Sequence, residues 1–172
     1  RADTAIFYSI SSTQDGLRGI SFGNFLIKRV VEELKRDFPS LRSFATLSPI
    51  PGFVRWLQSD AAKECPISAS TQSKLKRVGI EAGDARALWQ AMAERDWRSD
   101  AKMAVAVADP LTAACANYLA EGRQGLRPID PVARFHLDNG ARIERLNWLA
   151  DTSAKGIKQS AGLMVNYLYD PS

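Results

Sequence analysis

Residues 4 to 48 constrain the fold of this chain more than any other stretch, because they predict a strand, a long amphipathic helix and a second strand. Apolar residues from Phe22 to Phe38 recur four apart, Ile27 and Val31 widen this stripe, and charged residues occupy the other face of the helix. Pro39 lacks an N–H and ends the helix. Two strands joined in this way are almost always parallel, with a right-handed crossover. The stretch therefore predicts an α/β unit.

The turn that precedes this helix is a candidate anion site. It contains Gly19, Ser21 and Gly23. The start of a helix presents unpaired N–H groups and about half a positive charge, which favour a bound phosphate. The alternative is that the glycines only keep the turn tight. Spacing alone favours that second interpretation, since short glycine-containing turns before helices are common.

The remaining sequence predicts helices packed on a mixed α/β sheet. Asp130 is placed as an N-cap, Pro131 as the first helical residue and Asn139-Gly140 as a left-handed end, so the helix between them has clear boundaries. The other expected segments, in order, are a short helix at 53–57, a polar surface loop from 58 to 80, a helical stretch over 81–121, a linker at 122–128, a strand at 141–148 whose residues alternate between two faces, a turn or short helix at 151–158 and a final strand at 162–169. Within the helical stretch, a first stripe from Ala85 ends near Trp97, and 101–121 form one or two helices with Pro110 near the N-terminal turn of the second.

Length and charge exclude several classes of function. A chain of 172 residues fits one domain. Its net charge of +4 comes from 23 basic residues dispersed among 19 acidic ones, so a nucleic-acid face is unsupported and a small polyanionic ligand fits better.

Cysteine and hydropathy patterns bear on the compartment. Cys65 and Cys115 lie far apart and the chain has one histidine, so no zinc site is indicated and a reducing compartment is expected. No leader and no apolar run of about 18 residues is evident, which predicts a cytoplasmic protein without a membrane partner. The abrupt start in a strand suggests that upstream sequence is lacking.

Ser48 is the first candidate for chemistry. Pro49 and Pro51 cannot extend a hydrogen-bond ladder, so Ser48 is expected to end its strand. Ligands of open α/β sheets bind beyond the carboxyl ends of parallel strands, where Ser48 and the glycine-containing turn would meet. The alternative is that the hydroxyl only satisfies a turn before proline.

His136 is the second candidate. It follows Val132 by four positions and should face inward, where a lone histidine is more often a satisfied core residue than a catalyst. Its place in the last helical turn, however, favours a protonated ring and hence a proton donor. No Gly-x-Ser-x-Gly motif is present and Asp138 should face elsewhere, so no hydrolase triad is assigned.

Several long strings, in order along the chain, closely resemble the malonyl-CoA decarboxylase family. The resemblance is weakest from 60 to 125. The strings are Phe7–Gln14, Gly19–Glu33, Leu47–Phe53, Phe135–Gly140, Leu146–Asp151 and Gly162–Tyr167.

The resemblance implies a GNAT-like acyl-CoA-binding fold in which residues 1–172 form the catalytic domain, with a helical insertion at about 53–125. In the family a helical domain and the first strands of the sheet come before this region, and the protein is a multimer, so a homo-oligomer is expected. The coenzyme A cradle falls on the turn, where Ser21 replaces the usual glycine of the pattern. Its residues would be Arg18, Gly19, Ile20, Ser21, Phe22, Gly23 and Asn24.

By the same resemblance, Ser48 and His136 correspond to the catalytic pair and Tyr169 to an active-site tyrosine. The implied reaction converts malonyl-CoA to acetyl-CoA and CO2 through an enolate. It needs no metal or organic cofactor, because the thioester accepts the electrons. The alternatives are a GNAT-fold acyl-CoA N-acetyltransferase and a non-catalytic helical binding module.

Overall fold

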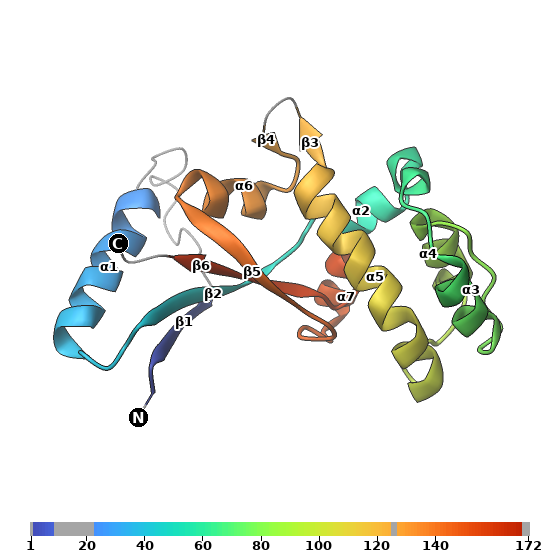
Figure 1. Cartoon of the computed structure of the whole chain (residues 1–172), viewed down its shortest axis with the longest axis horizontal. Helices are drawn as coiled ribbons and strands as arrows, with labels where there is room; N and C mark the ends of the chain where they lie inside the picture. Colours follow the sequence, from blue (N-terminus) through green and yellow to red (C-terminus); the bar gives the residue numbers. More distant parts are fainter. Residues whose placement is uncertain (1, 9–22, 125–126, 170–172) are drawn as a thin grey trace.

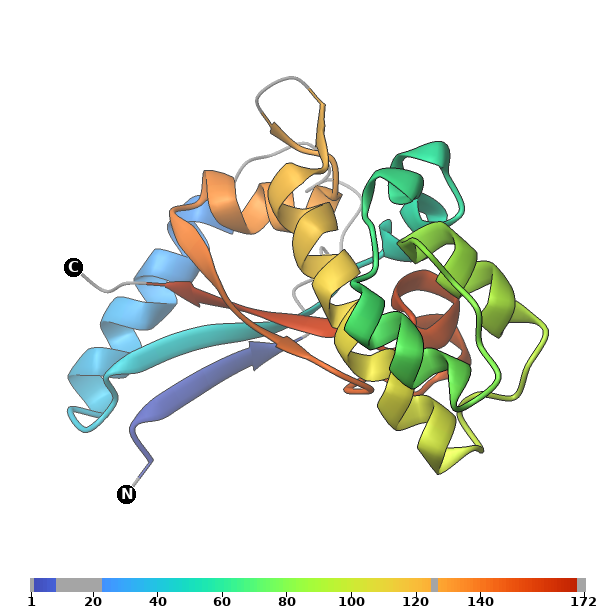
Figure 2. The ribbon, with the colours of Figure 1, turned by 45° about the vertical axis from the view of Figure 1, so that its right-hand side comes forward.

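The computed structural model describes residues 2–8, 23–124 and 127–169 as a mixed α/β structure. Its main sheet has the strand order β1-β2-β6-β5, with helices at both ends (Figures 1 and 2). The elements in chain order are β1 (Thr4–Tyr8), α1 (Gly23–Asp37), β2 (Ser43–Pro49), α2 (Phe53–Leu57), the 3-10 helix η2 (Asp60–Glu64), α3 (Ala69–Lys76), α4 (Ala85–Ala93), α5 (Ala101–Glu121), β3 (Arg123–Gln124), β4 (Arg127–Pro128), α6 (Pro131–Asp138), β5 (Ala141–Asn147), α7 (Ala154–Ser160) and β6 (Met164–Tyr169).

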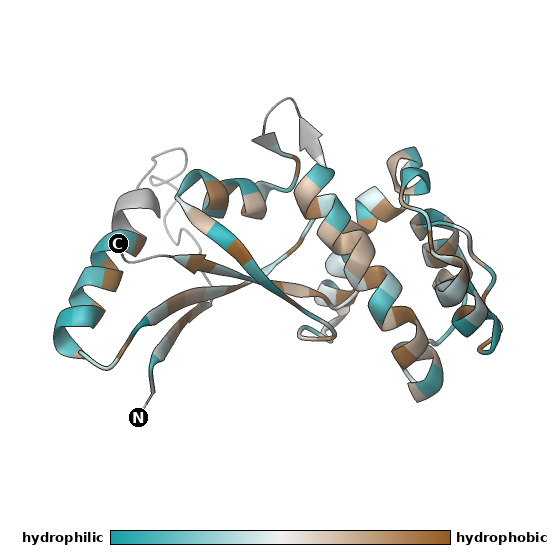
Figure 3. Ribbon diagram, viewed as in Figure 1, coloured by the Kyte–Doolittle hydropathy of each residue, from teal (hydrophilic) through white to brown (hydrophobic). Residues whose placement is uncertain are grey.

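The predicted strand–helix–strand unit is confirmed. β1 pairs in parallel with β2, from Thr4 opposite Ser43 to Tyr8 opposite Leu47. The buried face of α1 is confirmed at Ile27 and Val31, whereas Val30 and Phe38, which were predicted to share it, are exposed. α1 has hydrophilic and hydrophobic residues along its length, as expected of a helix on the surface of a sheet (Figure 3).

Three predictions between 58 and 128 were wrong. The expected loop contains η2 and α3, and Ser68 caps α3 by accepting from the Thr71 N–H. The first helix of the predicted helical stretch is α4, which ends at Ala93 and not near Trp97. Residues 101–121 form one continuous helix, which was one of the two predicted alternatives, with Pro110 inside it. The expected linker contains β3 and β4, which pair antiparallel. Short polar helices such as α3 are hard to predict because their apolar stripe is weak; Leu75 is its one buried residue.

The alternation predicted for 141–148 was also wrong. Ile143 pairs with Tyr167 and Arg145 with Asn166, so a β-bulge separates Ile143 from Arg145. Neighbouring residues of β6 point to opposite faces, and therefore Ile143 and Arg145 do so too. The predicted final strand begins two residues late, after Gly162 adopts a positive φ of 82°.

One face of the two central strands is fully buried. β2 and β6 are antiparallel, with Phe44 opposite Tyr169 and Ser48 opposite Val165. This face carries hydroxyl groups among apolar side chains. Because buried polar groups require hydrogen-bond partners, these hydroxyls must contact other polar groups within the protein, and the face is a candidate functional surface. The residues on this face that are buried are Phe44, Thr46 and Ser48 of β2 and Val165, Tyr167 and Tyr169 of β6.

α5 is the central helix of the part of the chain between β2 and α6. Of the described helices, α5 alone is long and apolar enough to cross a membrane, with a mean hydropathy of 1.2 over 18 residues, which the sequence analysis did not anticipate. Half of that window is buried within the protein, as in a core helix. Its buried residues are Met103, Val107, Pro110, Leu111, Ala114, Cys115, Tyr118 and Leu119.

Two valines of α5 provide a matched test of this packing. Val107 is fully buried and Val105 is 75% exposed. We expect Val107→Ala to lower the free energy of unfolding by about 2 kcal/mol, because a cavity replaces packed methyl groups. Val105→Ala should change it by less than about 0.5 kcal/mol. Urea unfolding of both variants measures the difference, and equal effects would contradict the buried orientation of α5.

Candidate active site

Ser48 lies near the end of β2, on the buried face of the sheet. β2 continues for one residue beyond the predicted end, since Pro49 pairs with Met164. The last parallel pair between the described residues of β1 and β2 is Tyr8 with Leu47, and Ser48 is the next residue of β2. Ser48 is 5% exposed, and its hydroxyl therefore needs partners within the protein.

His136 reaches this hydroxyl from α6, which lies over β5 and β6 in Figure 1. The predicted cap is present: the Asp130 side chain accepts from the backbone N–H groups of Val132 and Ala133, with Pro131 in the first turn. Six residues after the cap, the imidazole of His136 points toward the sheet and is 2% exposed.

The imidazole contacts three residues of the central strands. Its Nε2 lies 3.1 Å from Ser48 Oγ, and its Nδ1 lies 2.8 Å from the Tyr169 hydroxyl. The ring of Tyr167 stacks on it, with centroids 4.3 Å apart and planes 22° apart. The structure thus brings together Ser48, His136 and Tyr169, which the family resemblance had singled out.

The hydrogen-bond directions assign the tautomer of His136. Ser48 donates its proton to Thr46 Oγ1 at 2.9 Å, so Ser48 must accept from Nε2–H. A neutral imidazole has one N–H, which leaves Nδ1 as an acceptor for the hydroxyl of Tyr169. The donors therefore run from Tyr169 through His136 and Ser48 to Thr46. In this state Ser48 is not activated as a nucleophile.

Burial lowers the pKa of His136 from 6.5 to about 4. The prediction of a ring protonated by the end of its helix was therefore wrong for this structure. A helix end stabilises a cation by at most about 2 kcal/mol, whereas the lowered pKa corresponds to about 3 kcal/mol against the charged ring. Burial also raises the pKa of Tyr169 to about 12, so its hydroxyl keeps its proton.

Thr46 completes the site, and sequence reasoning did not identify it. The backbone pairing of β2 and β6 is interrupted after Ala45 and resumes at Ser48. In the gap, Asn166 Nδ2 donates to the Thr46 carbonyl at 2.8 Å, and the Tyr167 N–H donates to Thr46 Oγ1 at 3.4 Å. Thr46 Oγ1 thus accepts from both Ser48 and Tyr167. No pattern in the sequence distinguishes this threonine from an ordinary strand residue.

Asp130 is connected to more than the helix that it caps. One carboxylate oxygen accepts from Val132 and Ala133, each at 3.0 Å. The other accepts from the Gly52 N–H and the Tyr118 hydroxyl, each at 3.2 Å. Burial, and then the charge of Asp130, raise the pKa of Tyr118, so this hydroxyl remains a donor. The N-cap was predicted from the sequence, but the contacts with α5 and the loop after β2 were not.

The predicted phosphate cradle lies mostly outside the described residues. Arg18, Gly19, Ile20, Ser21 and Phe22 belong to the part of the chain that the structure does not describe. The backbone of Gly23 and Asn24 forms the first residues of α1.

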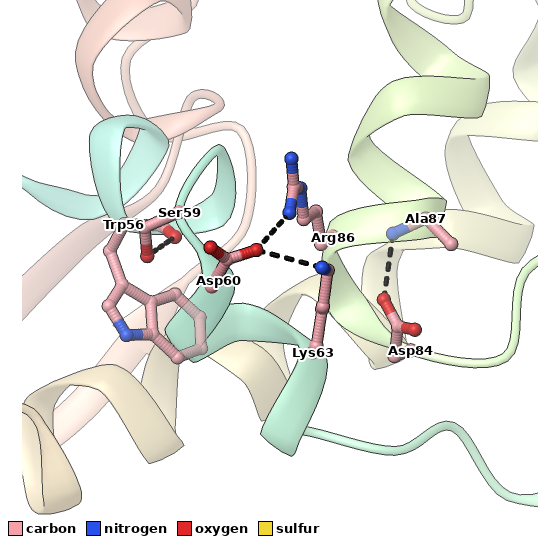
Figure 4. Close-up of polar contacts among 7 residues, drawn as sticks. All are labelled: Trp56, Ser59, Asp60, Lys63, Asp84, Arg86 and Ala87. Carbon is pink, nitrogen blue, oxygen red and sulfur yellow. Dashed lines mark hydrogen bonds and ion pairs between the residues drawn. The ribbon is translucent and has the colours of Figure 1, made fainter.

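A second polar cluster joins η2 to α4, at the other end of the molecule from α1 (Figures 1 and 4). Lys63 Nζ lies 2.8 Å from the Asp60 carboxylate, which Arg86 also contacts. A hydrogen bond and the charge of Lys63, followed by the charge of Arg86, lower the pKa of exposed Asp60. Because one carboxylate binds both cations, this cluster is explained as a link between two helices. In the described part of the chain, no group of His, Cys, Asp and Glu residues is arranged to hold a metal ion.

Comparisons with known proteins place this site in a family context. Residues 1–172 match the family model for the malonyl-CoA decarboxylase C-terminal domain. The chain is 45% identical over 175 residues to the mitochondrial malonyl-CoA decarboxylase of Rattus norvegicus, covering 98% of this chain and 36% of that protein.

Two solved structures of bacterial malonyl-CoA decarboxylases are similar to it. The enzyme from Cupriavidus metallidurans has a TM-score of 0.79 and 46% identity, covering 98% of this chain and 42% of that one. The enzyme from Agrobacterium vitis has a TM-score of 0.78 and 49% identity, covering 98% and 39%. The chain therefore spans little more than a third of the length of these relatives.

The neutral imidazole makes a prediction about stability and pH. His136 is the only histidine in the chain, so its titration can be observed without overlap. Because its folded pKa of about 4 is below the ordinary 6.5, the unfolded chain binds the additional proton between these values, and stability falls as pH falls.

We therefore expect the free energy of unfolding to drop by about 3 kcal/mol more in the natural chain than in His136→Gln between pH 7 and pH 4. Urea unfolding at several pH values measures the drop, and NMR of the single imidazole measures its pKa. An imidazole that titrates near 6.5 in the folded chain would contradict the buried neutral state.

Proposed function

The chain belongs to the family of malonyl-CoA decarboxylase C-terminal domains, and from this membership we propose that it carries the reaction centre of a malonyl-CoA decarboxylase. The substrate would be malonyl-CoA and the products acetyl-CoA and CO2. Because the chain covers 36% of the rat relative, we propose this activity for the longer protein, with residues 1–172 contributing the catalytic groups.

The observation that carries the proposal is the hydrogen bond between Ser48 and His136, from two elements 88 positions apart. Both side chains are buried on the side of the sheet that α6 covers. A buried pair with an inward N–H donor, flanked by a tyrosine hydroxyl at 2.8 Å, supports a proton-transfer site.

The proposed reaction begins when the bond between the malonyl carboxylate carbon and the adjacent methylene carbon breaks. CO2 leaves, and the bonding electrons pass to the thioester, giving an enolate with its charge largely on oxygen. A proton then bonds to carbon and yields the acetyl thioester. Each turnover consumes one malonyl-CoA carboxylate and one proton, and it yields one CO2 and one acetyl-CoA. Preorganised donors to such an oxygen contribute about 10²–10³ in rate each, and we assign this task to backbone N–H groups near the strand ends.

We propose that His136 supplies the proton. Ser48 would bind the malonyl carboxylate and then pass this proton to the enolate carbon. A free imidazole with a pKa of about 4 carries no extra proton at neutral pH. A carboxylate within about 4–6 Å raises a neighbouring histidine pKa by about 1–3, so substrate binding would bring the pKa of the ring close to neutral pH and allow it to take up a proton. Nδ1, which already accepts from Tyr169, would take up the proton, while Nε2 would release one through Ser48.

The proposal includes a binding mode for coenzyme A. The helix start and preceding turn, Arg18–Asn24, would hold its pyrophosphate through backbone N–H groups and the Arg18 side chain. The reaction needs no metal or organic cofactor, because the thioester itself accepts the electrons.

We further propose a GNAT-like fold for this domain, completed by upstream strands and a helical domain in the longer protein, with assembly into a homo-oligomer and no nucleic-acid or membrane partner. A cytoplasmic location remains our prediction for this chain. The name of the rat relative, by contrast, states that it is mitochondrial.

Loss of either member of the pair should reduce decarboxylation strongly. We expect Ser48→Ala and His136→Gln each to lower kcat by about 10²–10⁴, since a positioned acid contributes that much. Ser160→Ala is the matched control, because Ser160 is equally buried but donates to the Gly156 carbonyl in α7. Release of labelled CO2 from malonyl-CoA measures the rate. Incubation with acetyl-CoA and amines tests for an acetyltransferase, and acetyl transfer without CO2 release would overturn the proposal.

The hydroxyl of Tyr169 should have a smaller effect. Tyr169→Phe removes the donor to Nδ1 and leaves the Nε2–H contact to Ser48 in place. We expect kcat to fall by about tenfold, as for the loss of one hydrogen bond, with a small change in KM. Tyr8→Phe, at a hydroxyl on a side chain that is 76% exposed, should have no effect. Equal kcat values for Tyr169→Phe and Tyr8→Phe would show that the Tyr169 hydroxyl takes no part in the reaction.

A further inference from the structure

Asp130 holds together three segments that meet around the proposed site. It is 1% exposed, and its carboxylate accepts four hydrogen bonds. Two of the donors are at the start of α6, one is the backbone N–H of Gly52 in the loop after β2, and one is the hydroxyl of Tyr118 near the end of α5.

Helix capping alone does not explain a carboxylate here. A cap requires one oxygen, and serine, threonine or asparagine supplies it as well as aspartate. At Asp130 the capping oxygen is Oδ1, whereas Oδ2 faces Gly52 and Tyr118. Only a carboxylate offers two acceptor oxygens to four donors without an N–H of its own.

The link connects the two halves of the proposed reaction centre. Gly52 follows Ser48 by four residues, through a stretch stiffened by Pro49 and Pro51. His136 follows Asp130 by six residues, through α6. Asp130 therefore ties the segment that carries Ser48 to the helix that carries His136, whose side chains meet at 3.1 Å.

The fit around Gly52 is tight. A Cβ atom at this position would lie 2.1 Å from the Tyr118 hydroxyl oxygen and 3.3 Å from Asp130 Oδ2. Real Cβ atoms do not approach that closely, so a larger residue at 52 must displace Tyr118. The glycine is explained by this close approach, as its backbone φ of −92° is open to any residue.

We propose that Asp130 is a positioning residue for the reaction, which sets the distance between Ser48 and His136 by binding Gly52 and Tyr118 with the oxygen that does not cap α6. The inference rests on the proposed decarboxylation for its kinetic readout. Its spectroscopic readout is independent of activity.

Asp130→Asn is the decisive variant. Its amide can keep the cap through its oxygen, but its NH2 group then faces the N–H of Gly52, and two donors cannot bond. Asp100→Asn is the matched control, because Asp100 caps α5 through the same kind of contacts, to the Lys102 and Met103 N–H groups at 2.9 and 3.1 Å. Asp100 is exposed, and no contact joins it to the site. Gly52→Ala should act like Asp130→Asn, by displacing Tyr118.

The spectroscopic measurement is the ¹⁵N NMR spectrum of the single imidazole in the 172-residue chain. In the natural chain and in Asp100→Asn, the shifts should report the Nε2–H tautomer alone. In Asp130→Asn and Gly52→Ala they should move toward the average of two tautomers, because the Ser48 contact is loosened. Circular dichroism and a cooperative thermal transition establish that each variant is folded.

The kinetic measurement is CO2 release. A misplacement of about 1 Å costs about 10²-fold in rate, so kcat should fall by about that factor in Asp130→Asn, with KM changed by less than about threefold. If Asp130→Asn is folded and its imidazole shifts and kcat equal those of Asp100→Asn, the positioning role is wrong. If the longer protein with the natural sequence releases no CO2 although Asp130→Asn changes the imidazole shifts, the proposed function fails and the positioning role stands.

Discussion

Burial of an uncharged imidazole against the central strands is the constraint on which this structure depends. A buried ring with two nitrogen atoms needs two partners, since an unpaired buried polar group costs about 1–3 kcal/mol. Ser48 and Tyr169 supply them from antiparallel strands, at 3.1 and 2.8 Å. The observed register of β2 and β6 places both residues on one face of the sheet. A slip of one residue would turn one of the hydroxyls to the other face of the sheet. The site therefore depends on the pairing of β2 with β6, and a sheet of similar composition but different register would not form it.

Local patterns predicted much of the frame that holds the ring. The periodicity from 4 to 48, the cap at Asp130 and Pro131, and the position of His136 on the inner side of its helix all depend on interactions within a few residues. The parts that were missed depend on long-range contacts or on weak patterns. The bulge between Ile143 and Arg145 appears only when β5 is paired with β6, and the role of Thr46 only when β6 is placed beside β2. The charge of His136 could not be predicted from its helix position, because burial against Tyr167 and Tyr169 outweighs the helix end.

The helices between β2 and α6 contribute to the site through one residue. α5 is long, and many of its residues are buried, whereas the sequence predicted only one or two helices over this stretch. In the structure its Tyr118 lies among Phe53 and Trp56 of α2, with ring centroids 5.8 and 5.5 Å away, and donates to Asp130. The packing of α2 on α5 thus fixes the hydroxyl of Tyr118, and this hydroxyl in turn holds the carboxylate of Asp130. Because Phe53, Tyr118 and Asp130 are all buried, a displacement of α2 or α5 would be transmitted to α6, as expected of close-packed interiors.

A neutral resting imidazole also bears on how the proposed reaction would distinguish its substrate from its product. Malonyl-CoA carries a carboxylate that acetyl-CoA lacks, and it is the approach of this anion that would raise the pKa of His136 from about 4 and bring the proton into the site. After CO2 has left and the proton has bonded to carbon, neither charge remains, and the ring returns to the state seen here. The buried site would then hold the product less tightly than the substrate, because acetyl-CoA has no carboxylate to pair with a protonated imidazole, and a buried charged ring without a counter-ion is costly. The burial that disfavours a protonated His136 in the free site would in this way couple protonation of the ring to the presence of the malonyl carboxylate, the group that leaves as CO2.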